Sequence, residues 1–265
     1  MDKAIEVKSL VKKFNDFVAV NDISFDVKRG EIFAFLGPNG AGKTTTIKML
    51  TTLLHPTSGQ ILVNGYDPVK DQNNVRKSFG IVFQDPSLDD ELTTYENMEF
   101  HGVLYGLDKK LMTNRIEELL NIVDLWDRKD SLVKTFSGGM RRRLEIARGL
   151  LHHPKVFFLD EPSLGLDPQT RTHLWNYVKD LNKKENITIF FTTHYMEEAE
   201  RVAERIAVID HGKIVAHGTL DELKKHTSTN TLEEAFLKLT GTEIREEEAG
   251  AADHLRMARR MWRRK

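Results

Sequence analysis

The sequence contains no cysteine, no long apolar run and almost no net charge. Without cysteine the chain cannot form disulfides or thiolate metal sites, which fits a reducing compartment. No apolar run approaches the ~20 residues of a membrane span, and residues 1–6 carry charges where a signal peptide needs an apolar core. The net charge of −1 gives no overall field that attracts nucleic acid. We therefore expect a soluble chain with no nucleic-acid partner.

The composition is otherwise ordinary for a globular protein. The chain has 265 residues, of which 40% are hydrophobic and 30% are charged. This length is enough to bury a sizeable core as one domain, or as one domain with a subdomain.

Residues 37–45 match the phosphate-binding loop G-x-x-x-x-G-K-[ST] in its usual setting. An apolar run of strand length, 31–36, precedes the match, and residues 46–50 follow with helical spacing. The glycines let successive backbone N–H groups point at one centre, where the helix N-terminus adds partial positive charge. A glycine-rich turn without a ligand is the weaker alternative. The candidate ATP-binding residues are Gly37, Pro38, Asn39, Gly40, Ala41, Gly42, Lys43, Thr44 and Thr45.

An acidic pair, Asp160 and Glu161, follows the apolar run 156–159. Such a run is typical of a central strand of a parallel sheet, whose carboxyl end lies where these sheets bind ligands. There Asp160 and the Thr44 hydroxyl are candidate Mg²⁺ ligands. Lys43 reaches the β- and γ-phosphates, and Glu161 is a candidate base for the attacking water. A pair of solvated loop acids is the alternative, which the phosphate loop disfavours.

A second candidate anion site comprises Ser137, Gly138 and Gly139, at the start of a predicted helix over 138–151. A serine hydroxyl and two glycines at a helix N-terminus offer backbone N–H groups to an anion. One chain does not need two phosphate sites for one ATP. The spacing therefore suggests that this site serves a nucleotide held by another copy of the chain.

Periodicity predicts the order of the remaining elements. Alternation at residues 5–8 and 23–28 predicts antiparallel strands before the phosphate loop. Further strands are expected at 60–65, 80–84 and 187–193, with a hairpin over 206–216. Helices are expected at 73–77, 96–105, 111–123 and 168–184. The helical pattern between 85 and 153 predicts a helical subdomain inserted into an α/β core.

With these motifs in this order, the chain resembles the nucleotide-binding subunit of ATP-binding-cassette (ABC) transporters over residues 4–240. The resemblance implies an α/β fold with a P-loop NTPase (RecA-like) core of residues 1–84 and 154–240. A flanking antiparallel β-sheet and the inserted α-helical subdomain, 85–153, complete the nucleotide-binding domain, 1–240.

The resemblance also assigns roles to residues that motifs alone leave open. It implies that Phe14 stacks on adenine and that Gln84 senses Mg²⁺ and links to the membrane subunit. Asp167 belongs to a loop that crosses a dimer interface, and His194 contacts the γ-phosphate. In the family, the motif around Ser137 caps the γ-phosphate of the partner subunit's ATP.

The sequence departs from the family pattern at three positions. Phe14 replaces the usual Tyr, and Phe136 and Met140 replace the usual Leu and Gln around Ser137-Gly138-Gly139. Segments 83–89, 136–145 and 232–241 are similar to the daunorubicin-resistance type of drug and antibiotic exporter.

The resemblance implies an ATPase that uses ATP and Mg²⁺ to power export of drugs or antibiotic-like compounds. Two copies are expected to close head to tail on ATP, with a separate transmembrane permease as the other partner. The expected location is cytoplasmic, on the inner face of the membrane through that permease.

Two alternative functions remain at this point. A non-transport cassette ATPase acting on nucleic acid or ribosomes would use the same ATP chemistry, although the 94 positions between Lys43 and Ser137 (137 − 43) hold only a compact insert. A regulatory module that holds ATP without hydrolysis is the second, and intact Glu161 and His194 oppose it.

The charged tail, 241–265, is interpreted as partly disordered, or else as a basic segment that contacts anionic lipid or a membrane partner.

Overall fold

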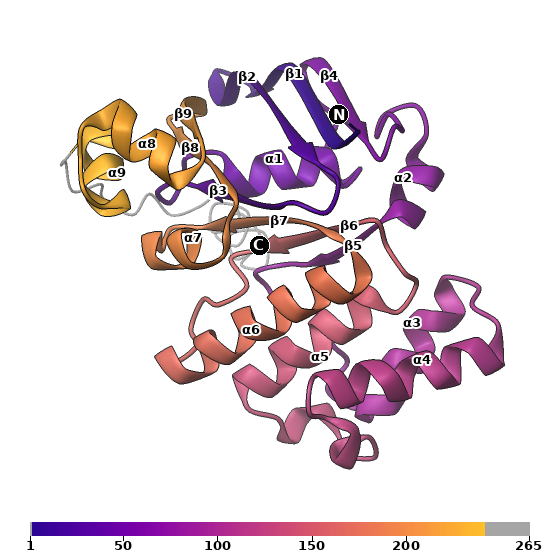
Figure 1. Ribbon diagram of the computed structural model, residues 1–265. Helices are drawn as coiled ribbons and strands as arrows, with labels where there is room; N and C mark the ends of the chain where they lie inside the picture. The colour runs from indigo at the N-terminus through magenta and orange to yellow at the C-terminus, as the bar shows by residue number, and fades with distance from the viewer. Residues whose placement is uncertain (1, 242–265) are drawn as a thin grey trace, which may run out of the picture.

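The computed structural model describes residues 2–241, so the predicted tail lies outside the described residues apart from Gly241. A six-stranded sheet in the order β5-β6-β7-β3-β8-β9 forms its centre (Figure 1). The first five strands in this order are parallel, and β9 pairs antiparallel with β8. Its strands are β3 (Ile32–Leu36), β5 (Phe79–Val82), β6 (Val156–Asp160), β7 (Thr188–Thr193), β8 (Arg205–Asp210) and β9 (Lys213–Gly218).

A second, three-stranded antiparallel sheet has the order β2-β1-β4. Its strands are β1 (Lys3–Phe14), β2 (Phe17–Lys28) and β4 (Ser58–Val63). The first two extend well beyond the predicted segments. The register of their pairing shifts between Val7 and Leu10, where Ser9 has a φ of 45°. A bulge of this kind interrupts the alternation from which strands are predicted.

Helices cover both faces of the central sheet. Helix α1 (Lys43–Leu50) lies between the two sheets, and its buried side chains pack with residues of both (Figure 1). The other face packs against α5 (Gly138–Leu150) and α6 (Pro168–Glu185), beyond which lie α3 (Thr94–Leu104) and α4 (Lys109–Ile122). A short helix, α2 (Gln72–Ser78), precedes β5, and two 3-10 turns, η1 (Trp126–Arg128) and η2 (Val133–Thr135), precede α5.

Side chains at the helix starts explain where several of these helices begin. Thr93 and Glu96 form a reciprocal capping box at α3, and Ser137 caps α5 by accepting a hydrogen bond from the Met140 N–H. At α6, Asp167 accepts from the Thr170 N–H, and a proline occupies the first helical position.

The class of fold predicted from the sequence is confirmed, with two differences in detail. The strand predicted to end at Gln84 ends at Val82, so Gln84 lies exposed in the loop that follows. Three helices near the carboxyl end were not predicted: α7 (Met196–Val202), α8 (Leu220–Thr227) and α9 (Leu232–Thr240). Each is short, at seven to nine residues, and hydrophobic periodicity needs a longer window. Within residues 2–241, no helix combines the length and apolar character that crossing a bilayer requires.

Candidate functional site

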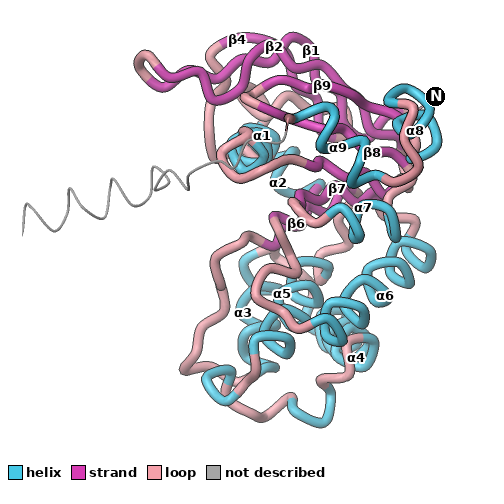
Figure 2. The backbone as a smooth tube through the Cα atoms, turned by 90° about the vertical axis from the view of Figure 1, so that its left-hand side faces the viewer, coloured by secondary structure: helices cyan, strands magenta, loops and turns pink. Residues whose placement is uncertain are grey.

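The phosphate loop connects β3 to α1, which Figure 2 shows below β1, β2 and β4. The loop packs closely against neighbouring segments. A Cβ atom at Gly37 would lie 2.4 Å from the Ile209 carbonyl oxygen, and one at Gly42 would lie 2.6 Å from that of Ala19. Gly42 also has a φ of 103°, which residues with a side chain rarely adopt. These two glycines are therefore required by close backbone contact as well as by the phosphate-loop pattern.

Lys43 is buried, and all three hydrogens of its ammonium group have acceptors. Its Nζ donates to the carbonyl oxygens of Gly37 at 2.8 Å and Pro38 at 3.1 Å. It also forms an ion pair with Glu161 Oε1 at 3.0 Å. An ammonium group has three donors, so a phosphate can bind Lys43 only by displacing one of these oxygens.

Glu161 has a backbone conformation that directs its side chain into this cluster. Its φ is 46°, in the left-handed region, which costs a non-glycine residue of the order of 1 kcal/mol or more. Its N–H donates to the carbonyl oxygen of Thr192 at 3.2 Å and to the Thr192 hydroxyl at 3.0 Å. These hydrogen bonds to β7 hold the strained residue in place.

His194 contacts the second carboxylate oxygen of Glu161, with Nδ1 3.1 Å from Oε2. Burial by itself raises the pKa of Glu161, but the His194 hydrogen bond and the Lys43 charge together lower it to about 2. The carboxyl is therefore ionised, and an ionised carboxylate only accepts hydrogen bonds, so Nδ1 of His194 carries the hydrogen.

Asp160 ends β6 beside these residues and accepts hydrogen bonds from two threonine hydroxyls. Thr192 Oγ1 donates to Asp160 Oδ1 at 2.6 Å, and Thr44 Oγ1 donates to the same oxygen at 3.2 Å. Burial raises the pKa of Asp160, and the two hydroxyl hydrogen bonds oppose that shift. The structure thus brings together Lys43, Thr44, Asp160, Glu161 and His194, and we call these five residues the phosphate-loop cluster.

A second buried network, which the sequence prediction missed, is centred on Glu198, four residues after His194. Glu198 is only 2% exposed. It accepts hydrogen bonds from the hydroxyls of Ser163 and of Thr193, the latter at 2.7 Å, and Arg171 lies 3.5 Å away. The network joins the loop 163–167 to the strand end that carries His194. An acid four residues after His194, in an otherwise surface-like helix start, was the available signal.

Ser137, Gly138 and Gly139 lie apart from the phosphate-loop cluster. Within residues 2–241, no hydrogen bond or ion pair joins them to it. They lie beside the start of α6 instead: a Cβ atom at Gly139 would be 2.5 Å from Thr170 Cγ2, and one at Gly138 would be 4.0 Å from Leu166 Cδ2. Ser137 and Gly138 are exposed, so the N-terminus of α5 faces solvent near Thr170, to which Asp167 is hydrogen-bonded.

Two predicted residues lie outside both groups. Phe14 ends β1, is 43% exposed, and has the Lys12 ammonium 4.9 Å above its ring. Gln84 lies in the loop after β5, and its carbonyl oxygen accepts from Arg142 Nη2 at 3.2 Å. Their roles with adenine and Mg²⁺ stay predictions.

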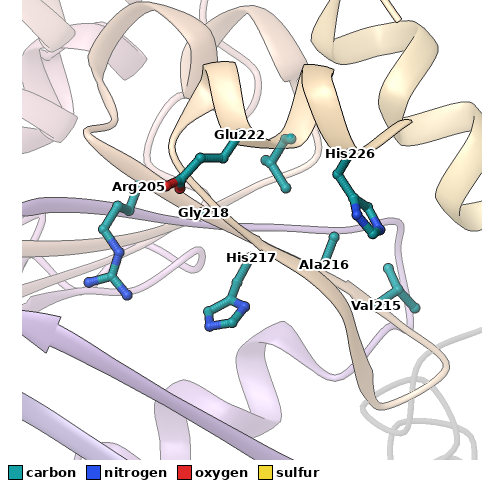
Figure 3. A pocket seen from close by; sticks show the side chains of 8 residues that line it. Arg205, Val215, Ala216, His217, Gly218, Glu222 and His226 are labelled. Carbon is teal, nitrogen blue, oxygen red and sulfur yellow. The ribbon is translucent and has the colours of Figure 1, made fainter. Parts of the chain in front are cut away.

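A cavity of about 580 Å³ lies elsewhere, between β9 and α8 (Figure 3). Its charged groups are already engaged. Arg205 pairs with Asp26 at 3.6 Å and with Glu31 at 3.3 Å, and Glu222 accepts from the Thr219 N–H as part of a capping box. The phosphate-loop cluster is therefore the candidate active site.

A glycine-rich loop whose lysine pairs with an acid just beyond the carboxyl end of a parallel strand is typical of a P-loop ATPase. Comparison with known proteins specifies which kind. The pattern of the ABC transporter family matches residues 20–164. The chain belongs to this family, so the resemblance predicted from its motifs is confirmed, and it is an ATP-binding ATPase.

Several relatives are similar over most of the chain. The daunorubicin/doxorubicin resistance ATP-binding protein DrrA of Streptomyces peucetius is 44% identical over 230 residues, covering 87% of this chain and 69% of the relative. The linearmycin resistance ATP-binding protein LnrL of Bacillus subtilis is 40% identical, covering 86% of this chain and 73% of the relative. A dimeric ATP-binding cassette in a post-hydrolysis state, bound to ADP and Pi, superposes with a TM-score of 0.73 at 26% identity, covering 82% of this chain and 98% of that one.

Proposed function

We propose that this ATPase powers the export of drugs or other hydrophobic, antibiotic-like compounds through a separate transmembrane permease. The observation that carries the proposal is similarity, over more than four-fifths of the chain, to resistance ATP-binding proteins named for different antibiotics. The test is to express the chain with the membrane protein encoded beside it in an antibiotic-sensitive host, with Glu161→Gln as the matched control. Resistance and ATP-dependent uptake into inverted vesicles are expected only with the unmodified chain. Equal sensitivity of the two strains to every antibiotic tested would contradict export.

Two copies of the chain are proposed to close head to tail, so that each ATP lies between Lys43 of one copy and Ser137 of the other. The exposure of Ser137 and Gly138, apart from the phosphate-loop cluster, supports this arrangement. The similarity to a dimeric cassette bound to ADP and Pi supports it as well. Asp167 is proposed to lie at the dimer interface, since it is hydrogen-bonded to Thr170, which lies beside Gly139 of the same helix N-terminus.

Mg²⁺ is proposed to bind at Thr44 and Asp160. The hydroxyl and carboxylate oxygens of these residues are 3.2 Å apart, and hard oxygen donors of this kind are the ligands that Mg²⁺ prefers. The amide oxygen of Gln84 is the proposed third protein ligand. When bound, the ion supplies positive charge to the β- and γ-phosphate oxygens.

Glu161 is proposed as the base for the attacking water, and the Lys43–Glu161 ion pair as the reason that it stays inactive without ATP. A carboxylate with a pKa of about 2 is a weak base. A γ-phosphate that draws Lys43 away removes one of the two groups that lower this pKa, which makes Glu161 more basic. His194, already bonded to Glu161, then keeps the carboxylate oriented towards the water and itself contacts the γ-phosphate.

The permease is proposed to dock on an apolar patch of Phe100, Val103, Leu104 and Leu111, which are 62–69% exposed. The first three share one face of α3 by their i, i+3, i+4 spacing, and α4 packs against α3 where Gly102 meets Met112. Such docking would hold the subunit at the inner face of the membrane. Val103→Glu with Leu104→Glu should abolish co-purification with the permease and leave basal ATPase activity unchanged. The control is Leu53→Glu, which places a charge on an exposed apolar residue just after α1, where 58% of Leu53 is exposed.

A further inference from the structure

Three charged side chains lie on one face of α5 at spacings of i, i+3 and i+6: Arg142, Glu145 and Arg148. They contact the loop of residues 83–87, which contains Gln84. The side chains of Arg142 and Glu145 are only 9% and 4% exposed. Burying an ion pair is weak evidence for stabilisation, because desolvation offsets most of the attraction. Stability alone therefore does not explain why Arg142 and Glu145 are buried against this loop.

Arg142 binds the backbone of the loop directly. Its Nη1 donates to the carbonyl oxygen of Phe83 at 2.6 Å, and its Nη2 donates to that of Gln84 at 3.2 Å. Nη1 also pairs with Glu145 Oε2 at 2.9 Å. The rigid guanidinium group thus binds two successive carbonyl oxygens at once, with a fixed geometry that a flexible ammonium group lacks.

Glu145 and Arg148 hold the far end of the same loop at Ser87. Glu145 Oε1 accepts from the Ser87 N–H at 2.7 Å and from its hydroxyl at 3.2 Å. Arg148 Nη1 donates to the Ser87 carbonyl oxygen at 2.7 Å, and Nη2 donates to the hydroxyl. Every polar group of Ser87 is therefore bonded to α5.

We propose that Arg142, Glu145 and Arg148 form a clamp that joins the Gln84 loop to the helix whose N-terminus is Ser137-Gly138-Gly139. They are positioning residues for ATP hydrolysis: a displacement of Gln84 carries the second anion site with it. The proposal rests on the proposed roles of Gln84 and Ser137. Because α5 is one uninterrupted helix of 13 residues, its first turn follows the turns that hold the loop.

The clamp also lies in the electric field of the candidate Mg²⁺ site. Burial lowers the pKa of Arg142, and the carboxylates of Glu145 and Asp160 oppose that shift. Arg142 is thus close enough to feel the charge of Asp160 while its side chain binds the Gln84 backbone.

The first test measures the loop position itself, independently of what Gln84 does. Because the chain has no cysteine, spin labels attach only at introduced sites such as Asp85→Cys and Asn114→Cys. Both positions are exposed, one in the loop and one on α4, which packs with α5 in the same core. We expect one narrow distance distribution between the labels, with or without ATP, and a broadened one after Arg142→Met.

The matched control is Arg143→Met, one residue further along α5. Arg143 Nη1 donates to the Val123 carbonyl oxygen at 2.7 Å and lies 3.9 Å from Asp124, away from the Gln84 loop. It should leave the distance distribution narrow. If Arg142→Met also leaves it narrow, the clamp does not hold the loop and the proposal is overturned, whatever the role of Gln84.

The second test separates positioning from a purely structural role. Arg142→Met should lower kcat for ATP hydrolysis about tenfold and leave KM for ATP within about twofold, because nucleotide binding uses other residues. Arg142→Lys should recover part of the loss. Arg142→Met with Glu145→Gln removes the unpaired buried charge, so it should recover thermal stability but not kcat.

A parallel Gln84→Ala variant distinguishes the two ways in which these ideas can fail. If Gln84→Ala lowers kcat while Arg142→Met matches Arg143→Met in kcat, the clamp proposal fails and the role of Gln84 stands. If Gln84→Ala has no effect but Arg142→Met broadens the distances and lowers kcat, the clamp stands and the role of Gln84 fails.

Discussion

The phosphate-loop cluster and the Ser137-Gly138-Gly139 site satisfy their polar groups in opposite ways. In the first, Lys43 and Glu161 are 5% and 8% exposed and are bonded to each other and to neighbouring oxygens. In the second, the first residues of a helix face solvent with only the Met140 N–H capped. Orphan N–H groups at a helix start attract anions. In the proposed composite site, the cluster is the buried half and must exchange partners to accept a nucleotide. The start of α5 is the exposed half and would meet a nucleotide held by a second copy.

The most disruptive change removes the central cation of the buried half. Lys43→Ala leaves the Glu161 carboxylate without its ion pair and removes the donor that reaches the phosphates. Truncating one partner of a buried charge pair costs about 2–5 kcal/mol, or roughly 30- to 4,000-fold in affinity. ATP binding measured by calorimetry should fall by that amount. Retained binding would remove Lys43 from the nucleotide site.

A smaller change to the same half should stop hydrolysis and spare binding. Glu161→Gln keeps the shape of the side chain but removes the base, so kcat should fall about 10²- to 10⁴-fold. ATP affinity should stay close to that of the unmodified chain, and closed dimers should accumulate in size-exclusion chromatography with ATP. Normal turnover by this variant would show that Glu161 is not the base.

The exposed half can be broken without touching the buried one. Gly138→Asp fits sterically, because a Cβ atom there meets only Leu166 Cδ2, at 4.0 Å. A carboxylate in the first turn stabilises a helix by about 0.3–1 kcal/mol, so the melting temperature should not fall. Hydrolysis should drop about tenfold or more, since the new charge repels the phosphates of a second copy's ATP. Gly138→Ala is the neutral control. Reduced ATP binding by single chains would contradict the separation of the two halves.

Acid should affect the helical subdomain, residues 85–153, and the phosphate-loop cluster in different pH ranges, which is the smallest of these effects. Burial, followed by the charge of Arg148, lowers the pKa of His101 from its usual 6.5 to about 4, and burial does the same for His152. Both contributions to stability are complete above pH 6.5 and are lost as pH falls to 4, because the unfolded chain takes up the protons first. The contribution of Glu161 is complete above pH 4.5 and is lost towards pH 2.

His101→Phe tests this difference. The ring can still stack on Tyr105, whose centroid lies 4.8 Å away, and the Nε2 that it removes is buried without a hydrogen-bond partner among the described residues. The loss of unfolding free energy between pH 6.5 and 4, measured with urea, should shrink by about 1–3 kcal/mol. His55→Gln, at an exposed position, is the control. An unchanged pH profile would contradict the assignment.

Local patterns were sufficient for the phosphate loop, the acidic pair and most helices and strands. Each of these depends on backbone conformation over a few residues, such as the turn at Gly42 or the proline that starts α6. The prediction that a strand ends at Gln84 was wrong because the apolar run before it does not reveal where pairing with β6 ends, at Val82.

Local sequence patterns place a lysine, two acids, a histidine and a second candidate anion site in a fixed order. Which of these residues meet depends on the tertiary structure. Lys43 meets Glu161 across 118 positions (161 − 43), and Thr192 bonds Asp160, because the strand order β6-β7-β3 places those strand ends side by side. Arg142 binds the loop at Phe83, 59 positions away. Strand order and helix packing depend on the whole core, so no local pattern specifies these contacts.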